Sequence, residues 1–410
     1  MSRAVLIGPF AQLLPMTGLP LKGALADEQL TIIENGGLIV SDGKIQKVGV
    51  FKDLKSNDVD VHRIEGKKVC LPGFIDAHTH ICFGGSRAKD YALRNAGKSY
   101  LEIAKAGGGI WDTVTQTRKA SQEDLIEGII SRSNTHLQNG ITTLEVKSGY
   151  GLSVDEELKM LWAIKLANEK SQVDLIPTCL AAHIKPKDWN QQIGYLEEIA
   201  STLFPILKSE NLAHRIDAFV EDSAFSEEEI TPYFQKAKAM GFDITVHADQ
   251  FTTGGSKVAV DFGAVSADHL EASTEEEIQL LAQSNTIATA LPGASIGLGC
   301  DFTPARKLLD AGAALAIASD HNPGSAPMGD LLTQASILGT FEKLSNTEVL
   351  AGITFRAATA LRLSDRGSLE ENTLADFIVF PTDNYQEITY HQGQLNPSEV
   401  WKNGKQVTSF

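Results

Sequence analysis

The feature that most constrains this chain is an alternation of short apolar runs with helical segments through its middle. Eight such runs occur between about residues 70 and 320, and nearly all their residues are apolar. Runs of this kind are typical of parallel strands that are covered on both faces. We expect strands at residues 70–77, 141–146, 173–181, 215–220, 242–247, 264–268, 286–291 and 314–319.

Helices are expected between these strands, and local signals mark where some of them begin and end. A serine followed three residues later by a glutamate is typical of a helix N-terminus, because each side chain can bond the other residue's backbone N–H. Asn139-Gly140 and Gly241 are expected to end helices. The serine–glutamate pairs are Ser153 with Glu156, Ser226 with Glu229, and Ser273 with Glu276.

The number of strand–helix units indicates the architecture. Eight units within about 250 residues match the size of a (β/α)8 barrel. An open doubly wound sheet is the alternative, but eight units exceed what most open sheets use. We therefore expect an α/β fold with a closed (β/α)8 TIM-type barrel, whose active site would lie at the carboxyl ends of the strands.

The two ends of the chain predict a different structure. Residues 31–64 contain an apolar run and the turn Asp42-Gly43, and residues 374–409 contain Asn403-Gly404, which is a strong hairpin signal. We expect both termini to combine into one small β-sandwich beside the barrel. The predicted domains are the N-terminal part of the sandwich at 1–66, the barrel at 67–366 and the C-terminal part of the sandwich at 367–410.

Composition limits the partners and the compartment. Of the 410 residues, 42% are hydrophobic and 21% are charged, as in a folded protein. No run approaches the roughly 20 apolar residues of a membrane helix. The net charge of −16 disfavours nucleic acids and anionic membranes as partners. The four cysteines form no C-x-x-C pair, which indicates reduced thiols and a cytoplasmic location.

The sharpest chemical signal is His78-Thr79-His80, at the end of the first predicted barrel strand. Residues two apart in a strand point to the same side, so both imidazoles can bind one ion. His247 ends the fifth predicted strand, and Asp320 follows the eighth. Nitrogen and carboxylate ligands suit Zn²⁺ or a similar first-row ion, with positions left open for water.

Further polar residues follow other strands. His183 comes after the third strand and His269 after the sixth. One histidine in such a place is more often structural, but four strand ends with histidine and a fifth with aspartate favour a metal site. Lys147 ends the second strand, away from the middle of the barrel, so a carbamylated lysine between two metals is disfavoured. Gly107-Gly108-Gly109 follows no strand and is interpreted as a flexible loop.

The segment Leu71–His80 resembles the first-strand motif of the amidohydrolase superfamily. Four further blocks narrow the resemblance to the imidazolonepropionase family, and the likeness then covers nearly the whole chain. The blocks that contain Lys-Ser-Gly-Tyr-Gly and Asp-x-Asn-Pro-Gly are the most specific. The four blocks are Ala106–Ile110, Glu145–Gly151, His247–Gln250 and Ser319–Gly324.

This resemblance implies an enzyme of histidine degradation that hydrolyses the ring C–N bond of 4-imidazolone-5-propanoate to N-formimino-L-glutamate. It implies one Zn or Fe ion per chain and a small anionic heterocyclic substrate. The implied metal ligands are His78, His80, His247 and Asp320. The implied substrate contacts come from Arg87, Tyr150, His183, Gln250, Asn322, Gly324 and Ser325.

Gln250 departs from some members of the family, which carry a glutamate there that has been considered a proton-transfer group. A neutral amide cannot serve as a general base. We therefore expect Asp320 to accept the proton from water and His269 to hydrogen-bond the hydroxide or the oxyanion. Arg87 can offer a planar fork to the propanoate, although a surface arginine is the plainer interpretation of that residue alone.

Two alternatives are open at this stage. Another amidohydrolase, such as a purine or pyrimidine deaminase, would share the fold and the metal site, because a fold does not fix the substrate. A catalytically inactive scaffold should have lost metal ligands, whereas all the candidate ligands are present in this sequence. The sequence does not decide between zinc and iron, and a homodimer is an expectation that it does not test.

Overall fold

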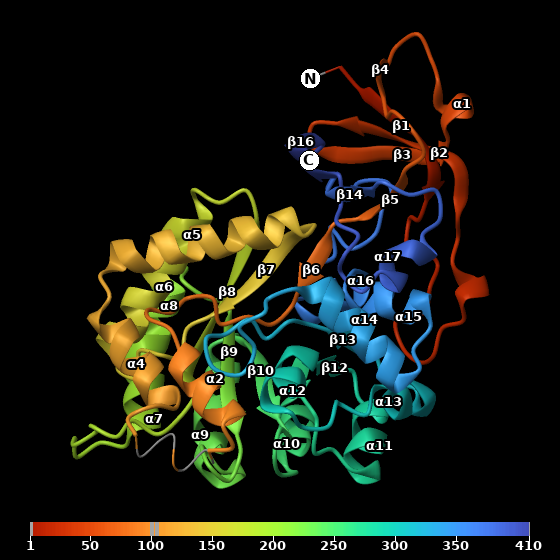
Figure 1. Ribbon diagram of the computed structural model, residues 1–410. Coiled ribbons are helices and arrows are strands. Elements are labelled where there is room, and N and C mark those ends of the chain that lie inside the picture. The colour runs from red at the N-terminus through yellow and green to blue at the C-terminus, as the bar shows by residue number, and fades with distance from the viewer. Residues whose placement is uncertain (1–2, 99–101, 103–105, 410) are drawn as a thin grey trace.

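The computed structural model describes residues 3–98, 102 and 106–409, and its strands form two sheets (Figure 1). The larger body is a parallel sheet with helices around it, in which each strand lies beside its sequence neighbours. All eight predicted barrel strands are present in the predicted order. They are β6 (Phe74–Asp76), β7 (Ile141–Lys147), β8 (Asp174–Ala182), β9 (Arg215–Val220), β10 (Asp243–Ala248), β11 (Ser266–His269), β12 (Ile287–Ala290) and β13 (Leu315–Ile317).

The barrel closes just beyond the carboxyl ends of its first and last strands. The strand ladder runs from β6 to β13, and an isolated bridge between Thr79 and His321 joins the segments that follow them. The Asp320 N–H donates to the His78 carbonyl at 3.0 Å, and the His80 N–H donates to the His321 carbonyl at 2.9 Å. The sheet is thus a nearly closed barrel, which confirms the predicted fold class.

Helices connect the barrel strands and cover their outer face (Figure 1). Among the residues that the structure describes, no helix is both long enough and apolar enough to cross a membrane. All four cysteines are free thiols. The helices along and after the barrel are α2 (Ala88–Asn95), α4 (Ile110–Lys119), α5 (Gln122–Gln138), α6 (Val154–Asn168), α7 (Tyr195–Glu198), η2 (Ile199–Leu203), α8 (Phe204–Ser209), α9 (Glu227–Ala239), α10 (Gly255–Phe262), α11 (Glu275–Gln283), α12 (Pro292–Leu298), α13 (Ala305–Ala311), α14 (Leu331–Glu342), α15 (Asn346–Gly352) and α16 (Phe355–Ala360).

One predicted helix cap is wrong and the others are in place. The N-cap of α11 is Thr274, which forms a capping box with Glu277, rather than Ser273. The Ser273 hydroxyl donates to the Asp249 carboxylate at 2.8 Å and is therefore not available to the helix. The confirmed features are the N-caps Ser153 and Ser226 and the positive-φ glycines Gly140 and Gly241 after α5 and α9.

The strands of the two termini form the second sheet, beside the barrel (Figure 1). This sheet is mixed and has the order β16-β15-β14-β5-β1-β2-β3, with β4 paired to β1, so the expected sandwich is one continuous hydrogen-bonded sheet. Both expected hairpin turns are present, because residues 42–43 and 403–404 all have positive φ. The elements are β1 (Val5–Leu13), η1 (Asp27–Gln29), β2 (Ile33–Ser41), β3 (Lys44–Val50), α1 (Phe51–Leu54), β4 (Asp60–Arg63), β5 (Val69–Pro72), β14 (Phe377–Phe380), α17 (Gln386–Tyr390), β15 (Glu399–Lys402) and β16 (Lys405–Ser409).

Gly73 is the point where the chain passes from the terminal sheet into the barrel. The sequence predicts one strand at 70–77, but the structure has two, because β5 pairs with β1 and β14 whereas β6 pairs with β7. A Cβ at residue 73 would lie 2.4 Å from the Thr142 Oγ1, so only glycine fits this crossing. The chain changes sheets a few residues after the boundary predicted at residue 67.

A buried lysine ties the terminal sheet to the barrel. The Lys402 Nζ lies 2.5 Å from an Asp376 carboxylate oxygen and 2.9 Å from an Asp174 carboxylate oxygen. It also donates to the Thr142 carbonyl at 3.2 Å. Lys402 and Asp376 belong to the C-terminal part of the chain, whereas Thr142 and Asp174 belong to barrel strands β7 and β8. One ammonium group therefore holds both sheets together.

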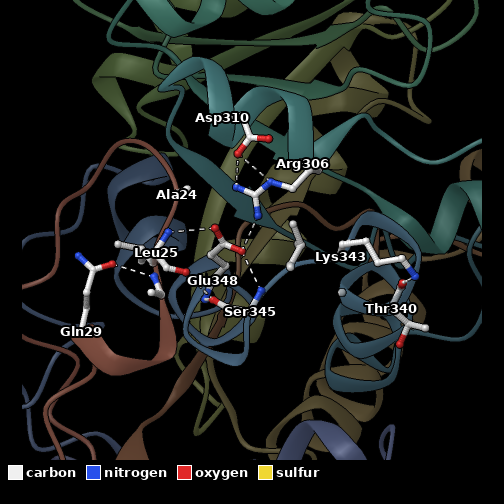
Figure 2. Close-up of a pocket in the computed structure, with 12 residues that line it drawn as sticks. Ala24, Leu25, Gln29, Arg306, Asp310, Thr340, Lys343, Ser345 and Glu348 are labelled. Carbon is white, nitrogen blue, oxygen red and sulfur yellow. Dashed lines mark hydrogen bonds and ion pairs between the residues drawn. The ribbon is translucent and has the colours of Figure 1, made fainter.

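Figure 2 shows a second junction, in a surface pocket where the segment before β2 meets α13 and α15. Glu348 lies between the two parts. Its Oε1 accepts from the Leu25 N–H at 2.9 Å, and its Oε2 lies 3.0 Å from the Arg306 Nη1. Arg306 also contacts Asp310 at 2.9 Å. Because these charges pair with one another and the pocket contains none of the predicted site residues, we interpret it as a structural contact.

We expect Lys402→Met to destabilise the fold without affecting the barrel's metal site. Removing one partner of a buried ion pair costs about 3–5 kcal/mol, because the other charge stays buried and unpaired. The midpoint of urea unfolding should therefore fall, and Lys402→Met/Asp376→Asn should recover part of the loss. If Lys402→Met unfolds at the wild-type urea concentration, Lys402 does not hold the two sheets together.

Candidate metal centre and active site

The four predicted metal ligands lie together at the carboxyl ends of the barrel strands. His78 and His80 follow β6, His247 lies in β10 and Asp320 follows β13. All four are buried, with at most 3% of their surface exposed. β6 and β13 are neighbours across the closure of the barrel, and β10 stands across from them. Three strands that are far apart in the sequence thus direct their side chains to one point.

Distances between the ligand atoms fit a single metal ion. The His80 Nε2 lies 3.2 Å from the Nε2 of His78 and 3.2 Å from the Nε2 of His247. The Asp320 Oδ1 lies 3.4 Å from the His80 Nε2 and 3.7 Å from the His78 Nε2. A tetrahedral ion with bonds of about 2.1 Å places its ligand atoms about 3.4 Å apart. The donor atoms therefore outline a site of the size that a first-row metal needs.

Electrostatics also favour a cation between these atoms. Burial, with repulsion from neighbouring cations, lowers the pKa of His78 and of His80 well below the usual value, so both rings are neutral. The His78 Nδ1 bonds a carboxylate, which leaves the lone pair of its Nε2 directed at the cluster. Two neutral imidazole nitrogens 3.2 Å apart must share either a proton or a cation, and the buried His80 Nδ1 has no hydrogen-bond partner among the described residues. The residues present thus fit a metal.

Two carboxylates that the sequence reasoning missed hold the metal-ligand rings. The Asp268 Oδ2 accepts from the His78 Nδ1 at 2.7 Å, and the Asp217 Oδ2 lies 3.0 Å from the His247 Nδ1. Carboxylates in this position fix the tautomer and the orientation of a metal-binding imidazole. A signal was present, because each aspartate is a charged residue inside an otherwise buried barrel strand.

His269 lies beside the metal-ligand cluster. Its ring centroid is 5.8 Å from that of His78 and 5.4 Å from that of His247. Its Nδ1 lies 3.3 Å from the Glu271 Oε1, which leaves the Nε2 for another partner. Burial alone would lower the pKa of His269, but the adjacent Glu271 outweighs it and raises the pKa. Residues 269, 270 and 320 have positive φ, so backbone strain gathers at this end of the barrel.

The loop after β13 fixes Asp320. The Asn322 Nδ2 donates to the Asp320 Oδ2 at 2.9 Å and to the Ser325 Oγ at 2.8 Å. The Asn322 Oδ1 accepts from the N–H groups of Gly324 and Ser325, at 2.7 and 2.8 Å. Asn322 is therefore engaged within the loop, and it orients the aspartate. Burial raises the pKa of Asp320 to about 6, against the attraction of nearby histidines.

Arg87 lies next to this loop, and its side chain is only 9% exposed. Its Nε donates to the Asp90 carboxylate at 2.5 Å, and its Nη1 donates to the Thr113 hydroxyl at 3.3 Å. A Cβ on Gly324 would approach the Arg87 Nη1 to 2.9 Å, so the glycine leaves room for the guanidinium group. Asp90 also accepts from the Gly109 N–H at 2.8 Å, which ties the glycine loop to α2. Arg87 is thus held in place by its neighbours.

Tyr150 and His183 lie close to the His80 ring. The His183 ring stacks on that of His80, with centroids 5.4 Å apart, and the Tyr150 ring is 6.0 Å away. The His183 Nδ1 bonds the Gly149 carbonyl at 3.0 Å, and burial lowers the pKa of His183 to about 3, so its Nε2 is a neutral acceptor. Gln250 follows β10 and is half-buried, and its side chain bonds none of the described residues.

Comparisons with known proteins agree with this arrangement. The chain matches the model of the amidohydrolase family over residues 207–407. It is 40% identical to the imidazolonepropionase of Paracoccus denitrificans over 370 residues, which cover 89% of this chain and 92% of the relative. It is also 40% identical to the imidazolonepropionase of Acinetobacter baumannii over 384 residues, which cover 93% of this chain and 94% of the relative.

Solved structures show the same fold at low sequence identity. A zinc-bound adenosine deaminase from Xanthomonas campestris has a TM-score of 0.71 at 18% identity and covers 98% of this chain and 92% of its own. Ochratoxinase from A. niger has a TM-score of 0.73 at 18% identity and covers 100% of this chain and 96% of its own. These likenesses show the barrel architecture, whereas the 40% identities extend over about nine-tenths of the sequence. The chain therefore belongs to the imidazolonepropionase family of amidohydrolases, hydrolases that act on a cyclic C–N bond.

Proposed function

We propose that this chain hydrolyses the ring C–N bond of 4-imidazolone-5-propanoate to give N-formimino-L-glutamate, with one zinc or iron ion per chain. The observation that carries the proposal is the convergence of three imidazole nitrogens and the Asp320 carboxylate at one end of the barrel, beside a fixed arginine. The family membership supports the choice of substrate. A cytoplasmic location and a homodimer stay predictions.

The metal would be held by His78, His80, His247 and Asp320. When bound, it would polarise the ring carbonyl and lower the pKa of a water molecule towards about 7. The chain's contribution is to present three buried imidazole nitrogens, two of them on the neutral rings of His78 and His80, and one carboxylate. Asp217 and Asp268 keep two of the rings in the orientation that this requires.

Asp320 is the group that we assign to proton transfer. Its Oδ1 faces the imidazole nitrogens, and its Oδ2 is held by the Asn322 amide. A carboxyl group with a pKa of about 6 can accept a proton from water and then release it to the leaving ring nitrogen near neutral pH. Gln250 has no titrating proton, so we assign it a role in holding the substrate only.

His269 would stabilise the negative charge that develops on the ring carbonyl oxygen. Glu271 binds the Nδ1 and raises the pKa of the ring, which favours a protonated imidazole. The Nε2–H can then donate to the oxyanion, which gains more from this bond than the neutral carbonyl does. Tyr150 and the neutral His183 complete the wall next to His80.

The propanoate tail requires a cation, and Arg87 supplies it. Asp90 and Thr113 hold the Nε and the Nη1, so the guanidinium plane is fixed before a ligand arrives. A fixed plane loses little conformational entropy when its remaining N–H groups bind a carboxylate. This cation favours an anionic substrate over the neutral bases of a purine or pyrimidine deaminase.

The direct test is the loss of imidazolonepropionate absorbance with purified protein. We expect rapid consumption by the metal-loaded chain and none after a chelator has removed the metal, because Asp320 alone does not lower the pKa of the water molecule. One equivalent of Zn²⁺ or Fe²⁺ per chain should restore the rate. Turnover of adenosine or cytosine with no effect on imidazolonepropionate would contradict the proposal, and so would a requirement for two ions per chain.

The role of Arg87 predicts a selective loss of affinity. Arg87→Ala should lower kcat/KM by about 10- to 150-fold, because a charge-assisted hydrogen bond contributes about 1.5–3 kcal/mol. Arg87→Lys should recover only part of this, because an ammonium group lacks the planar fork. The methyl ester of the substrate is the control, since it has no carboxylate. An equal loss on acid and ester would mean that Arg87 is needed for structure rather than for recognition.

The role of His269 predicts a loss in kcat. His269→Ala should lower kcat by about 10²–10⁴, the usual range for a positioned acid or base, while the metal content measured on the same sample stays at the wild-type value. Gln250→Glu should change kcat little, because it keeps an acceptor of similar size. If His269→Ala keeps a near-normal kcat and a full metal content, another residue must stabilise the oxyanion.

A further inference from the structure

Lys147 is a buried lysine that the reaction described above does not use. It ends β7, is fully buried, and points into the barrel. Its Nζ lies 2.8 Å from the Glu145 Oε2, 2.8 Å from the Asp217 Oδ2 and 3.7 Å from the Asp268 Oδ2. Burying an ammonium group is costly unless carboxylates surround it, and here they do. The three carboxylates therefore compensate the charge of the buried ammonium group.

Two of these carboxylates also touch the metal-ligand histidines, and they do so through the same oxygen atoms. The Asp217 Oδ2 lies 2.8 Å from the Lys147 Nζ and 3.0 Å from the His247 Nδ1. The Asp268 Oδ2 lies 3.7 Å from the Lys147 Nζ and 2.7 Å from the His78 Nδ1. One oxygen atom of each aspartate therefore links the ammonium group to a metal-ligand ring.

The third carboxylate, Glu145, forms no hydrogen bond to a histidine among the described residues, although it lies within 4.8 Å of His78. The Glu145 Oε1 accepts from the Thr178 hydroxyl at 2.5 Å and from the Arg215 Nε at 3.3 Å. Neither partner is a candidate metal ligand. Glu145 thus shares the lysine with the two aspartates but does not share their histidines. A variant of Glu145 therefore tests whether Lys147 stabilises the barrel, and variants of Asp217 and Asp268 test whether it positions the metal ligands.

We propose that Lys147 is a positioning residue for the metal centre: one ammonium group fixes Asp217 and Asp268, and through them the rings of His247 and His78. The inference rests on the metal site of the proposed function. It adds the residue that holds the two aspartates behind the metal ligands. Without the cation, the negative charges of the two aspartates would repel each other. A carbamylated Lys147 does not fit, because an anion would face three carboxylates within 3.7 Å.

The test measures metal binding by the apo chain rather than turnover. Wild-type and Lys147→Met proteins are stripped with a chelator and titrated with Co²⁺, whose visible spectrum reports the ligand geometry. We expect Lys147→Met to bind Co²⁺ about 10- to 100-fold more weakly, the usual cost of losing a partner of the metal ligands, with an altered spectrum. Unchanged or tighter binding with the wild-type spectrum would overturn the proposal.

Two matched variants separate positioning from stability. Lys402→Met also removes a buried lysine from two carboxylates, but neither of these touches a metal ligand. Glu145→Gln removes the carboxylate that contacts Lys147 but is not hydrogen-bonded to a metal-ligand histidine. Both should unfold more readily than the wild type and still bind Co²⁺ within about threefold of its affinity, because losses outside the ligand contacts do not reach the metal. An equal loss in Glu145→Gln would overturn the proposal.

If Lys147→Met cannot be obtained as a folded protein, Co²⁺ binding by variants of the two aspartates tests the proposal instead. Asp217→Asn and Asp268→Asn keep an oxygen for the histidine Nδ1–H but remove the charge that Lys147 holds. The proposal requires both to weaken Co²⁺ binding, and wild-type affinity in both would overturn it. Failure of the wild-type chain to bind Co²⁺ would overturn the metal site itself, whereas tight wild-type binding with no effect of these variants would remove only the role of Lys147.

Discussion

The hydrogen bond from the Asp320 N–H to the His78 carbonyl is the constraint on which the site depends. In an open sheet of the same order, β6 and β13 would be opposite edges, and their residues could not meet. Closure makes them neighbours, and His247 on β10 then reaches the same point from across the barrel. The strain of the positive φ at Asp320 is the cost of this closure, and the bonds from Asn322 stabilise it.

Inside the closed barrel, a polar core replaces the usual apolar one at the catalytic end. The candidate metal-ligand histidines lie together, and behind them Asp217 and Asp268 surround the ammonium group of Lys147. Charges buried this deeply are tolerated only when each has a partner. Burial would raise the pKa of Asp217, but His247 and Lys147 together hold it below the usual range, so this carboxylate is charged.

Much of this was readable in the sequence, and the limits have physical reasons. Strand ends could be located because the buried runs of a parallel sheet are almost entirely apolar, and the histidines lay directly at their ends. The partners of those histidines were missed, because an aspartate such as Asp268 inside a strand gives no sign of which ring it meets across the barrel. The division of the first predicted strand at Gly73 was also missed, because a single apolar run contains both β5 of the terminal sheet and β6 of the barrel. Ser273 and Thr274 are equally good caps in isolation, and only the position of Asp249 separates them.

The shared terminal sheet has a consequence for how the protein is made. β5 lies between β1 and β14, so one edge of the N-terminal strands stays unpaired until residues 377–380 have been synthesised. Open strand edges pair readily with other chains. At about 5–20 residues per second, the roughly 300 intervening residues take at least about 15 seconds to translate. The terminal sheet can therefore be completed only after the whole barrel has been translated.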